Sequence, residues 1–205
     1  TFPNTPYGTI GVFADDYFEN LVGAAKSLDR SELAKAAVVL QSAYKTGGYV
    51  FSCGNGGSAA ISNHLHCDHL KSVQTDTTLK PKVISLSAAM ETVTAIANDI
   101  SYDEVFVYQL KTLASPGDVL ITISSSGDSE NIVKACQWAK DNGVSIIAMT
   151  GFDGGRSRSL ADVSLHVHAD NYGVIEDLHQ SLMHVLAQFI RQNEMDDSLI
   201  TDRKF

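Results

Sequence analysis

Along this chain, short apolar runs rich in β-branched residues alternate with longer segments in which apolar residues recur every three or four positions. The short runs are typical of strands buried on both faces, and the periodic segments are typical of amphipathic helices. The predicted strands are 49–53, 82–86, 118–123, 144–149 and 163–167. The predicted helices are 13–28, 32–45, 59–70, 88–98, 102–114, 130–141 and 174–191, with a short helical turn after a loop over 151–158.

This alternation predicts an α/β fold built on one doubly wound, parallel, five-stranded sheet. We expect a single domain over residues 1–205, because no linker-like stretch divides the chain. Residues 1–10 are expected to form an irregular arm. Extra N-terminal helices over about 11–46 precede the first strand, so they can either pack on the sheet or supply a subunit interface.

A glycine-rich turn follows the first predicted strand. Gly54, Gly56 and Gly57 let the backbone turn sharply and lie close to a ligand, and Ser58 is expected to cap the next helix. The free N–H groups at such a helix start can hold an anion such as phosphate. The turn is neither G-x-G-x-x-G nor a Walker A sequence, so it indicates no dinucleotide or nucleoside triphosphate. An ordinary strand–helix turn is the alternative.

A second polar turn, 124–129, separates the strand 118–123 from the helix 130–141. It carries four serines, Ser124, Ser125, Ser126 and Ser129. Hydroxyls and backbone N–H groups can bind a phosphate monoester without a lysine, and both turns would lie at the carboxyl ends of strands, where open α/β sheets bind ligands. A serine-rich turn that merely caps a helix is the alternative. The absence of G-x-S-x-G argues against a nucleophilic serine.

Two helices carry histidines together with carboxylates. His64 and Asp68 are four residues apart, which places an imidazole beside a carboxylate for a divalent metal or for acid–base chemistry. A solvated polar face is the alternative. On the last helix, spacing alone pairs Glu176 with His179. His184 lies about 12 Å from Glu176 along the helix, so one metal shared by that pair needs both side chains to lean together or ligands from two subunits.

Composition narrows the class of protein. The net charge of −9 argues against nucleic acid as a partner, and no run approaches the roughly 18 apolar residues of a membrane span. No signal peptide is visible at the start. The three cysteines, an odd number, predict reduced thiols in a cytoplasmic protein.

The chain resembles the sugar isomerase (SIS) domain family over nearly its whole length. The resemblance rests on the turn 54–58, His64 with Asp68, the segment 97–99, the turn 124–129 and a closing helix with Glu176 and His184. Within this family, the chain resembles the phosphoheptose isomerase subfamily. The resemblance implies the flavodoxin-like SIS fold and an aldose–ketose isomerase that converts sedoheptulose 7-phosphate to D-glycero-D-manno-heptose 7-phosphate, in heptose biosynthesis for glycans such as lipopolysaccharide. It also implies one zinc ion per site and a homotetramer with active sites at subunit interfaces. A non-catalytic SIS-domain adaptor or sugar-phosphate sensor, such as a replication-initiator-binding protein, is the alternative.

The resemblance also assigns roles to individual residues. The catalytic residues would be Asp68, His184 and Asp99. The zinc ligands would be His64, Asp68, Glu176 and His184. The substrate and its phosphate would be held by Asn55, Gly56, Gly57, Ser58, Asn98, Asp99, Ser124, Ser125, Ser126, Ser129 and Glu176.

Three positions depart from the family pattern. Asp68 stands where the family has a glutamate, and the shorter side chain moves the carboxylate by about 1 Å, a misplacement that can cost on the order of a hundredfold in rate. Glu176 replaces a glutamine, which gives two histidines and two carboxylates, a set that suits Zn²⁺. Gly173 replaces an aspartate that contacts substrate. These departures leave the identity of the sugar open.

Overall fold

A computed structural model describes residues 2–205, and its centre is a parallel sheet of five strands in the order β2-β1-β3-β4-β5. The strands are β1 (Tyr49–Gly54), β2 (Lys82–Ser85), β3 (Val119–Ser124), β4 (Ser145–Thr150) and β5 (Val163–His166). The register pairs Gly54 with Ile123 and Ser124 with Thr150, so the carboxyl ends of β1, β3 and β4 meet at one edge. The predicted doubly wound, flavodoxin-like topology is confirmed.

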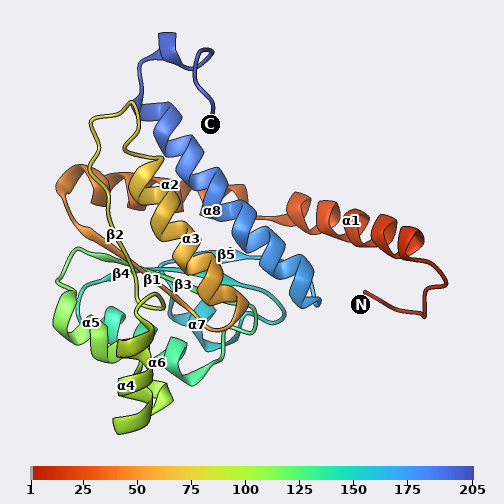
Figure 1. Cartoon of the computed structure of the whole chain (residues 1–205), viewed down its shortest axis with the longest axis horizontal. Helices are drawn as coiled ribbons and strands as arrows, with labels where there is room; N and C mark the ends of the chain where they lie inside the picture. The colour runs from red at the N-terminus through yellow and green to blue at the C-terminus, as the bar shows by residue number, and fades with distance from the viewer. Residues whose placement is uncertain (1) are drawn as a thin grey trace.

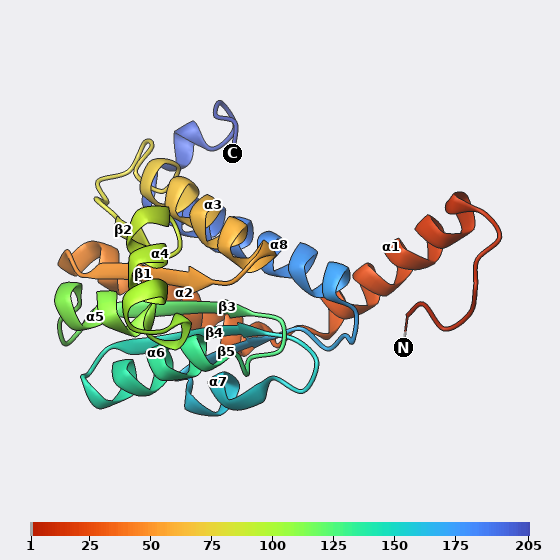
Figure 2. The ribbon, with the colours of Figure 1, turned by 60° about the horizontal axis from the view of Figure 1, so that its bottom comes forward.

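Helices cover both faces of the sheet. Helices α1 (Ile10–Ser27), α2 (Arg30–Thr46), α3 (Gly57–Lys71) and α8 (Tyr172–Glu194) share one apolar core, and α4 (Met90–Asp99), α5 (Val107–Leu113), α6 (Glu130–Asp141) and α7 (Gly155–Leu160) share the other. Figure 2 shows α3 and α8 on one side of the strands and α5, α6 and α7 on the other. Successive strand residues pack into opposite cores: Val50 lies in one and Phe51 in the other. Because both faces of the sheet are buried, the strands are apolar without interruption. Among residues 2–205, no helix is both long and apolar enough to cross a bilayer.

Two predicted elements differ from the structure. The single helix expected over 102–114 is wrong, because a 3₁₀ turn, Tyr102–Glu104, precedes the shorter α5. Val105 and Phe106 lie between the two and are buried in one core, and the Val105 N–H donates to the Tyr102 carbonyl oxygen at 3.4 Å, the three-residue spacing of a 3₁₀ turn. Helix α7 also begins inside the predicted loop 151–158. Asp29 caps α2, with its carboxylate accepting from the Ser31 and Glu32 N–H groups.

A buried histidine holds α3 against α8. His69 lies with Nε2 3.2 Å from the Met183 carbonyl oxygen and Nδ1 2.7 Å from the Tyr44 hydroxyl. Burial lowers the pKa of His69 to about 4, so the ring is neutral near pH 7. A neutral ring donates through one nitrogen and accepts through the other, so Nε2–H donates to Met183 and Nδ1 accepts from Tyr44. The sequence neighbours Asp68 and His184 are thereby held on facing turns of the two helices.

Helix α1 extends away from the sheet in both views (Figures 1 and 2). Its large apolar side chains Ile10, Val12, Phe18 and Val22 are at least half exposed. Residues 2–9 form an irregular arm, as expected, and this arm folds back so that the Phe2 ring packs on Phe13, with 5.1 Å between ring centroids. Since exposed apolar surface of this kind is typical of an interface, the helix is a candidate for contact with another subunit.

Candidate active site

The glycine-rich and serine-rich loops meet at the carboxyl edge of the sheet and enclose a cavity of about 180 Å³. Its walls are formed by Asn55, Ser58, Ile123, Ser124, Ser125, Ser126, Ser129, Tyr172 and Glu176. Two turns far apart in the sequence thus form one polar cavity, because β1 and β3 are neighbours in the sheet.

Two helices start at this cavity with their first-turn N–H groups free of capping side chains. The N-cap of α3 is Gly56 and that of α6 is Ser129, and neither makes a side-chain capping bond. The expectation that Ser58 caps α3 is therefore wrong: Ser58 lies one residue into the helix, with its side chain buried at the cavity wall. Ser125 Oγ is buried and has no hydrogen-bond partner among the described residues. Two positive helix ends and an unpartnered hydroxyl suit an anion such as phosphate.

The serine loop is shaped by its own hydroxyls. The Gly127 N–H donates to Ser124 Oγ at 3.1 Å, and the Asp128 N–H donates to Ser126 Oγ at 3.3 Å. Outside the cavity, Arg156 Nε donates to Asp128 Oδ1 at 2.6 Å and anchors the loop to the start of α7. The Ser124 and Ser126 side chains are therefore held in place before any ligand arrives.

Glu176 approaches α3 at Gly57. A β-carbon on Gly57 would lie 2.6 Å from Glu176 Oε2, so the carboxylate occupies the space that a side chain at 57 would take, and Gly56 turns the chain with a φ of +55°. The structure places the Glu176 carboxylate at the wall of the serine cavity. It lies outside the group of histidines and aspartate described next.

Asn55 is held by two residues that the sequence did not single out. The Tyr102 hydroxyl donates to Asn55 Oδ1 at 2.8 Å, and Asn131 Nδ2 donates to the same oxygen at 2.9 Å. Asn55 Nδ2 donates in return to Asn131 Oδ1 at 3.0 Å. Asn131 follows the serine turn by two residues, which was a usable signal, whereas nothing in the sequence pointed to Tyr102.

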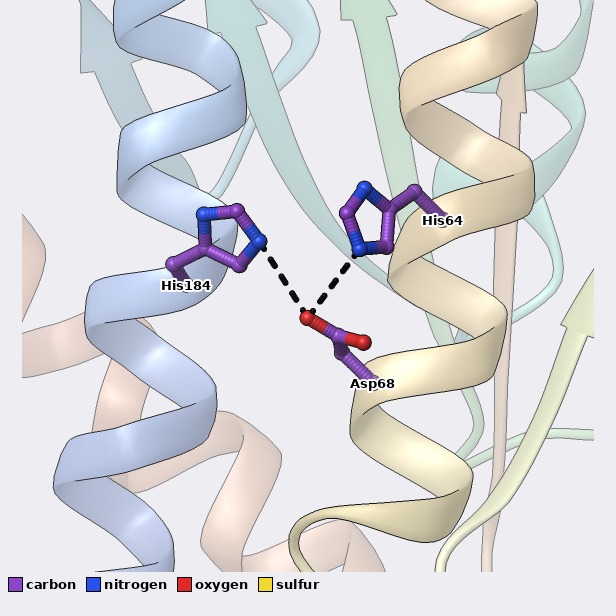
Figure 3. Close-up of side chains that lie close together, drawn as sticks. All are labelled: His64, Asp68 and His184. Carbon is purple, nitrogen blue, oxygen red and sulfur yellow. Dashed lines mark ion pairs between the residues drawn. The ribbon is translucent and has the colours of Figure 1, made fainter. Parts of the chain in front are cut away.

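A second cluster lies between α3 and α8, where His64, Asp68 and His184 point toward one another (Figure 3). Asp68 Oδ2 lies 3.4 Å from His64 Nε2 and 3.2 Å from His184 Nε2. The two rings are nearly perpendicular, with centroids 5.0 Å apart. His64 and Asp68 share a helix face, as their spacing predicts, and the packing of α8 adds His184.

The donor set of this cluster fits a zinc ion. Zinc prefers imidazole nitrogens and carboxylate oxygens at about 2.0–2.2 Å, which in a tetrahedron puts ligand atoms about 3.3 Å apart. The two distances from Asp68 Oδ2 lie close to that value, and one donor atom from each residue lies within 4.8 Å of the others. Three protein ligands also leave a coordination position for substrate or a further ligand. His64, Asp68 and His184 could therefore hold the metal.

Comparison with known proteins gives the family. Residues 15–151 match the family described as SIS domain. The chain belongs to the SIS domain family. The SIS-domain protein is similar to the phosphoheptose isomerase of Alteromonas mediterranea, at 37% identity over 179 residues that cover 86% of this chain and 87% of that one. The predicted family is thus confirmed.

Solved structures agree with this family. The SIS-domain protein resembles phosphoheptose isomerase GmhA from Neisseria gonorrhoeae, with a TM-score of 0.80 at 30% identity, covering 88% of this chain and 96% of that chain. It also resembles a phosphoheptose isomerase from Francisella tularensis, with a TM-score of 0.82 at 31% identity, covering 89% and 96% of the two chains. The likeness therefore extends over nearly the whole fold.

Some residues predicted to belong to the active site of the SIS-domain protein lie away from both the serine cavity and the histidine–aspartate cluster. Asn98 and Asp99 end α4 in exposed positions, where Asn98 Nδ2 donates to Asp99 Oδ1 at 2.8 Å, and neither lines the serine cavity. Their role stays a prediction. His179, which spacing paired with Glu176, is instead fully buried, and burial lowers its pKa to about 4.

At Gly173, the space beside the missing side chain is taken by a tyrosine. A β-carbon on Gly173 would lie 2.9 Å from the Tyr17 hydroxyl, which donates to Asp177 Oδ2 at 2.6 Å. Burial and this carboxylate raise the pKa of Tyr17 to about 12. In the SIS-domain protein a neutral hydroxyl from α1 therefore lies beside the position where the family pattern has an aspartate.

Proposed function

We propose that this SIS-domain protein is an aldose–ketose isomerase that converts sedoheptulose 7-phosphate to D-glycero-D-manno-heptose 7-phosphate. The observation that carries the proposal is one pair of helices, α3 and α8, with an anion-binding cavity at one end and an imidazole–carboxylate cluster farther along. The similarity to phosphoheptose isomerases over most of the chain supports the heptose substrate.

The spacing of the two clusters supports a long sugar. Glu176 lines the serine cavity and His184 belongs to the cluster, and eight residues of helix separate them by about 12 Å. A seven-carbon sugar with phosphate on its last carbon spans a distance of this order, whereas a triose phosphate does not. With the phosphate held by Ser58, Ser124, Ser125, Ser126 and Ser129, the first two carbons would reach the cluster.

Isomerisation moves a proton between adjacent carbons through an enediol, which requires a base and an acid. We assign the base to Asp68 and the acid to His184, which face each other across α3 and α8 through Asp68 Oδ2 and His184 Nε2. A nitrogen that binds zinc carries no proton, so His184 would act as the acid through the ring nitrogen that does not ligate the ion. The other Asp68 oxygen points away from both rings (Figure 3), and it is the one that would take the proton from carbon. When bound, a zinc ion supplies polarisation of the substrate oxygens. His64, Asp68 and His184 would hold it. Glu176 lies outside this cluster at the serine cavity, so its predicted ligation would require a ligand contributed across a subunit interface, and Asp99 stays a predicted catalytic residue.

The direct test is conversion of sedoheptulose 7-phosphate by the purified protein. The protein is loaded with Zn²⁺ or stripped with a chelator, and the sugar phosphates are followed by NMR. We expect the aldose product with the loaded protein, loss of turnover after stripping and recovery when Zn²⁺ is added back. Binding of the sugar phosphate without turnover by the loaded protein would favour the non-catalytic sensor or adaptor, and the isomerase proposal would then be withdrawn.

We further propose one SIS domain over residues 1–205 with an N-terminal helical extension over about 11–46. The family match ends at residue 151, but β5 pairs with β4 and α8 contributes to the same core, which supports a single unit. The three free cysteines support a cytoplasmic location, which cell fractionation would test, and the product would supply heptose for a glycan such as lipopolysaccharide.

We also propose that the protein assembles as a homotetramer with its sites at subunit interfaces. The exposed apolar side chains of α1 support this, together with Val185 and Phe189 on α8, each 48% exposed. We expect sedimentation velocity at micromolar concentration to give a species of about four chains of 22.1 kDa. A single 22.1 kDa species would contradict the proposed assembly.

A further inference from the structure

Gln180 lies between the two imidazoles of the cluster, and neither the sequence nor the proposed reaction assigns it a role. Its Nε2 is 2.8 Å from His64 Nδ1 and 3.3 Å from His184 Nε2. It stands on α8 one turn before His184 and one turn after Glu176, so it faces α3 from the same side as both. The side chain therefore reaches the histidine nitrogen that points away from Asp68.

The chemistry of a neutral imidazole explains why that contact matters. One ring nitrogen carries a hydrogen and the other has a free lone pair. His64 Nε2 faces Asp68 Oδ2 at 3.4 Å, so it is the nitrogen placed to bind a metal. Binding through Nε2 requires the hydrogen on Nδ1, and that N–H needs an acceptor to hold the ring in one orientation.

The Gln180 amide can offer His64 Nδ1 either a hydrogen-bond donor or a hydrogen-bond acceptor. Its oxygen and its NH₂ group have nearly the same size, so a half-turn exchanges them without disturbing the packing. With NH₂ toward His64, Nδ1 is an acceptor and the hydrogen sits on Nε2, where it blocks a metal. With the oxygen toward His64, the amide accepts from Nδ1–H and His64 Nε2 is free. The 3.3 Å contact to His184 Nε2 is then no hydrogen bond, because a nitrogen that binds a metal has no hydrogen to give.

We propose that Gln180 is a positioning residue of the metal site, whose amide oxygen accepts a hydrogen bond from His64 Nδ1–H. The inference rests on the metal site of the proposed function. The His64 side chain is 48% exposed, so without this bond solvent would allow its ring to turn. Partners of this kind typically raise metal affinity by about tenfold to a hundredfold.

Two substitutions at this position test whether Gln180 acts as a hydrogen-bond acceptor or only fills space. Gln180→Glu keeps an acceptor for Nδ1–H, whereas Gln180→Met keeps the length and removes it. Zinc affinity is measured by competition with a chromophoric chelator. We expect Gln180→Met to bind Zn²⁺ about tenfold to a hundredfold more weakly and Gln180→Glu to bind at least as tightly as the parent. Gln137→Met, on the exposed face of α6, is the matched control and should bind like the parent.

The ring of His64 gives a second readout that a purely structural role would not change. In long-range ¹H–¹⁵N spectra of the zinc-loaded parent, we expect His64 to carry its hydrogen on Nδ1, with a slowly exchanging N–H signal that Gln180→Met loses and Gln180→Glu keeps. If the methionine variant does not fold, the glutamate variant decides, and a tenfold loss of affinity there would overturn the acceptor role.

The outcomes distinguish this inference from the proposed function. Suppose that the parent binds zinc and isomerises the sugar phosphate, and that Gln180→Met matches it in zinc affinity and in the His64 spectrum. The role proposed for Gln180 is then wrong, while the proposed metal site is retained. If the parent binds no zinc, the metal site and the role of Gln180 both fail.

Discussion

Asp68→Asn is expected to lower kcat for heptose phosphate isomerisation by about a hundredfold to ten-thousandfold, the usual contribution of a general base. Asparagine keeps the size of the side chain but cannot accept a proton at the pH of the assay. It also removes the negative charge that lies 3.4 Å from His64 and 3.2 Å from His184, so the variant should retain less zinc. Turnover and metal content are measured on the same preparations.

Asp68→Glu is the matched control for this prediction, because it lengthens the side chain and keeps the carboxylate. It also restores the residue type of the family pattern. We expect the glutamate variant to retain zinc and to keep or raise turnover on the heptose phosphate, since the longer chain brings the base nearer to the substrate carbon. If Asp68→Asn were as active and as well loaded with metal as the parent, the cluster would be an ordinary polar helix face. The hypothesis of a non-catalytic adaptor would then replace the isomerase proposal.

The second large effect is expected from the phosphate-binding loop. Ser126→Ala combined with Ser129→Ala removes two hydroxyls from the wall of the cavity. A hydrogen bond to a charged group contributes about 1.5–3 kcal/mol, so losing two should raise KM by about a hundredfold to ten-thousandfold. The backbone N–H groups of α3 and α6 remain, so binding should weaken without vanishing.

Steady-state kinetics and the affinity for inorganic phosphate as an inhibitor measure this effect. Ser181→Ala is the control, since Ser181 is exposed on α8 and its hydroxyl bonds to Asp177 of its own helix. It removes a hydroxyl near the cluster without touching the cavity, so KM should stay at the value of the parent. An unchanged KM and inhibitor affinity in the double variant would show that the phosphate binds elsewhere.

The sequence by itself determined the fold class, the five strands and most of the helices. Strands buried on both faces must be apolar throughout, and helices buried on one face must repeat every three or four residues, so both leave a local pattern. The same local reasoning placed the glycine and serine turns at strand ends and put His64 and Asp68 on one helix face. It failed at 102–114, where a 3₁₀ turn ends before α5 begins, because the spacing of apolar residues did not reveal the break between them.

Only the tertiary structure decided which side chains meet across elements. His184 reaches Asp68 because α8 packs on α3, with His69 and the Met183 carbonyl fixing their relative position. The same packing puts Glu176 against Gly57 at the cavity and Gln180 beside His64. Spacing along one helix defines neighbours within a turn or two, but contacts between helices depend on how their surfaces pack, which no local pattern encodes.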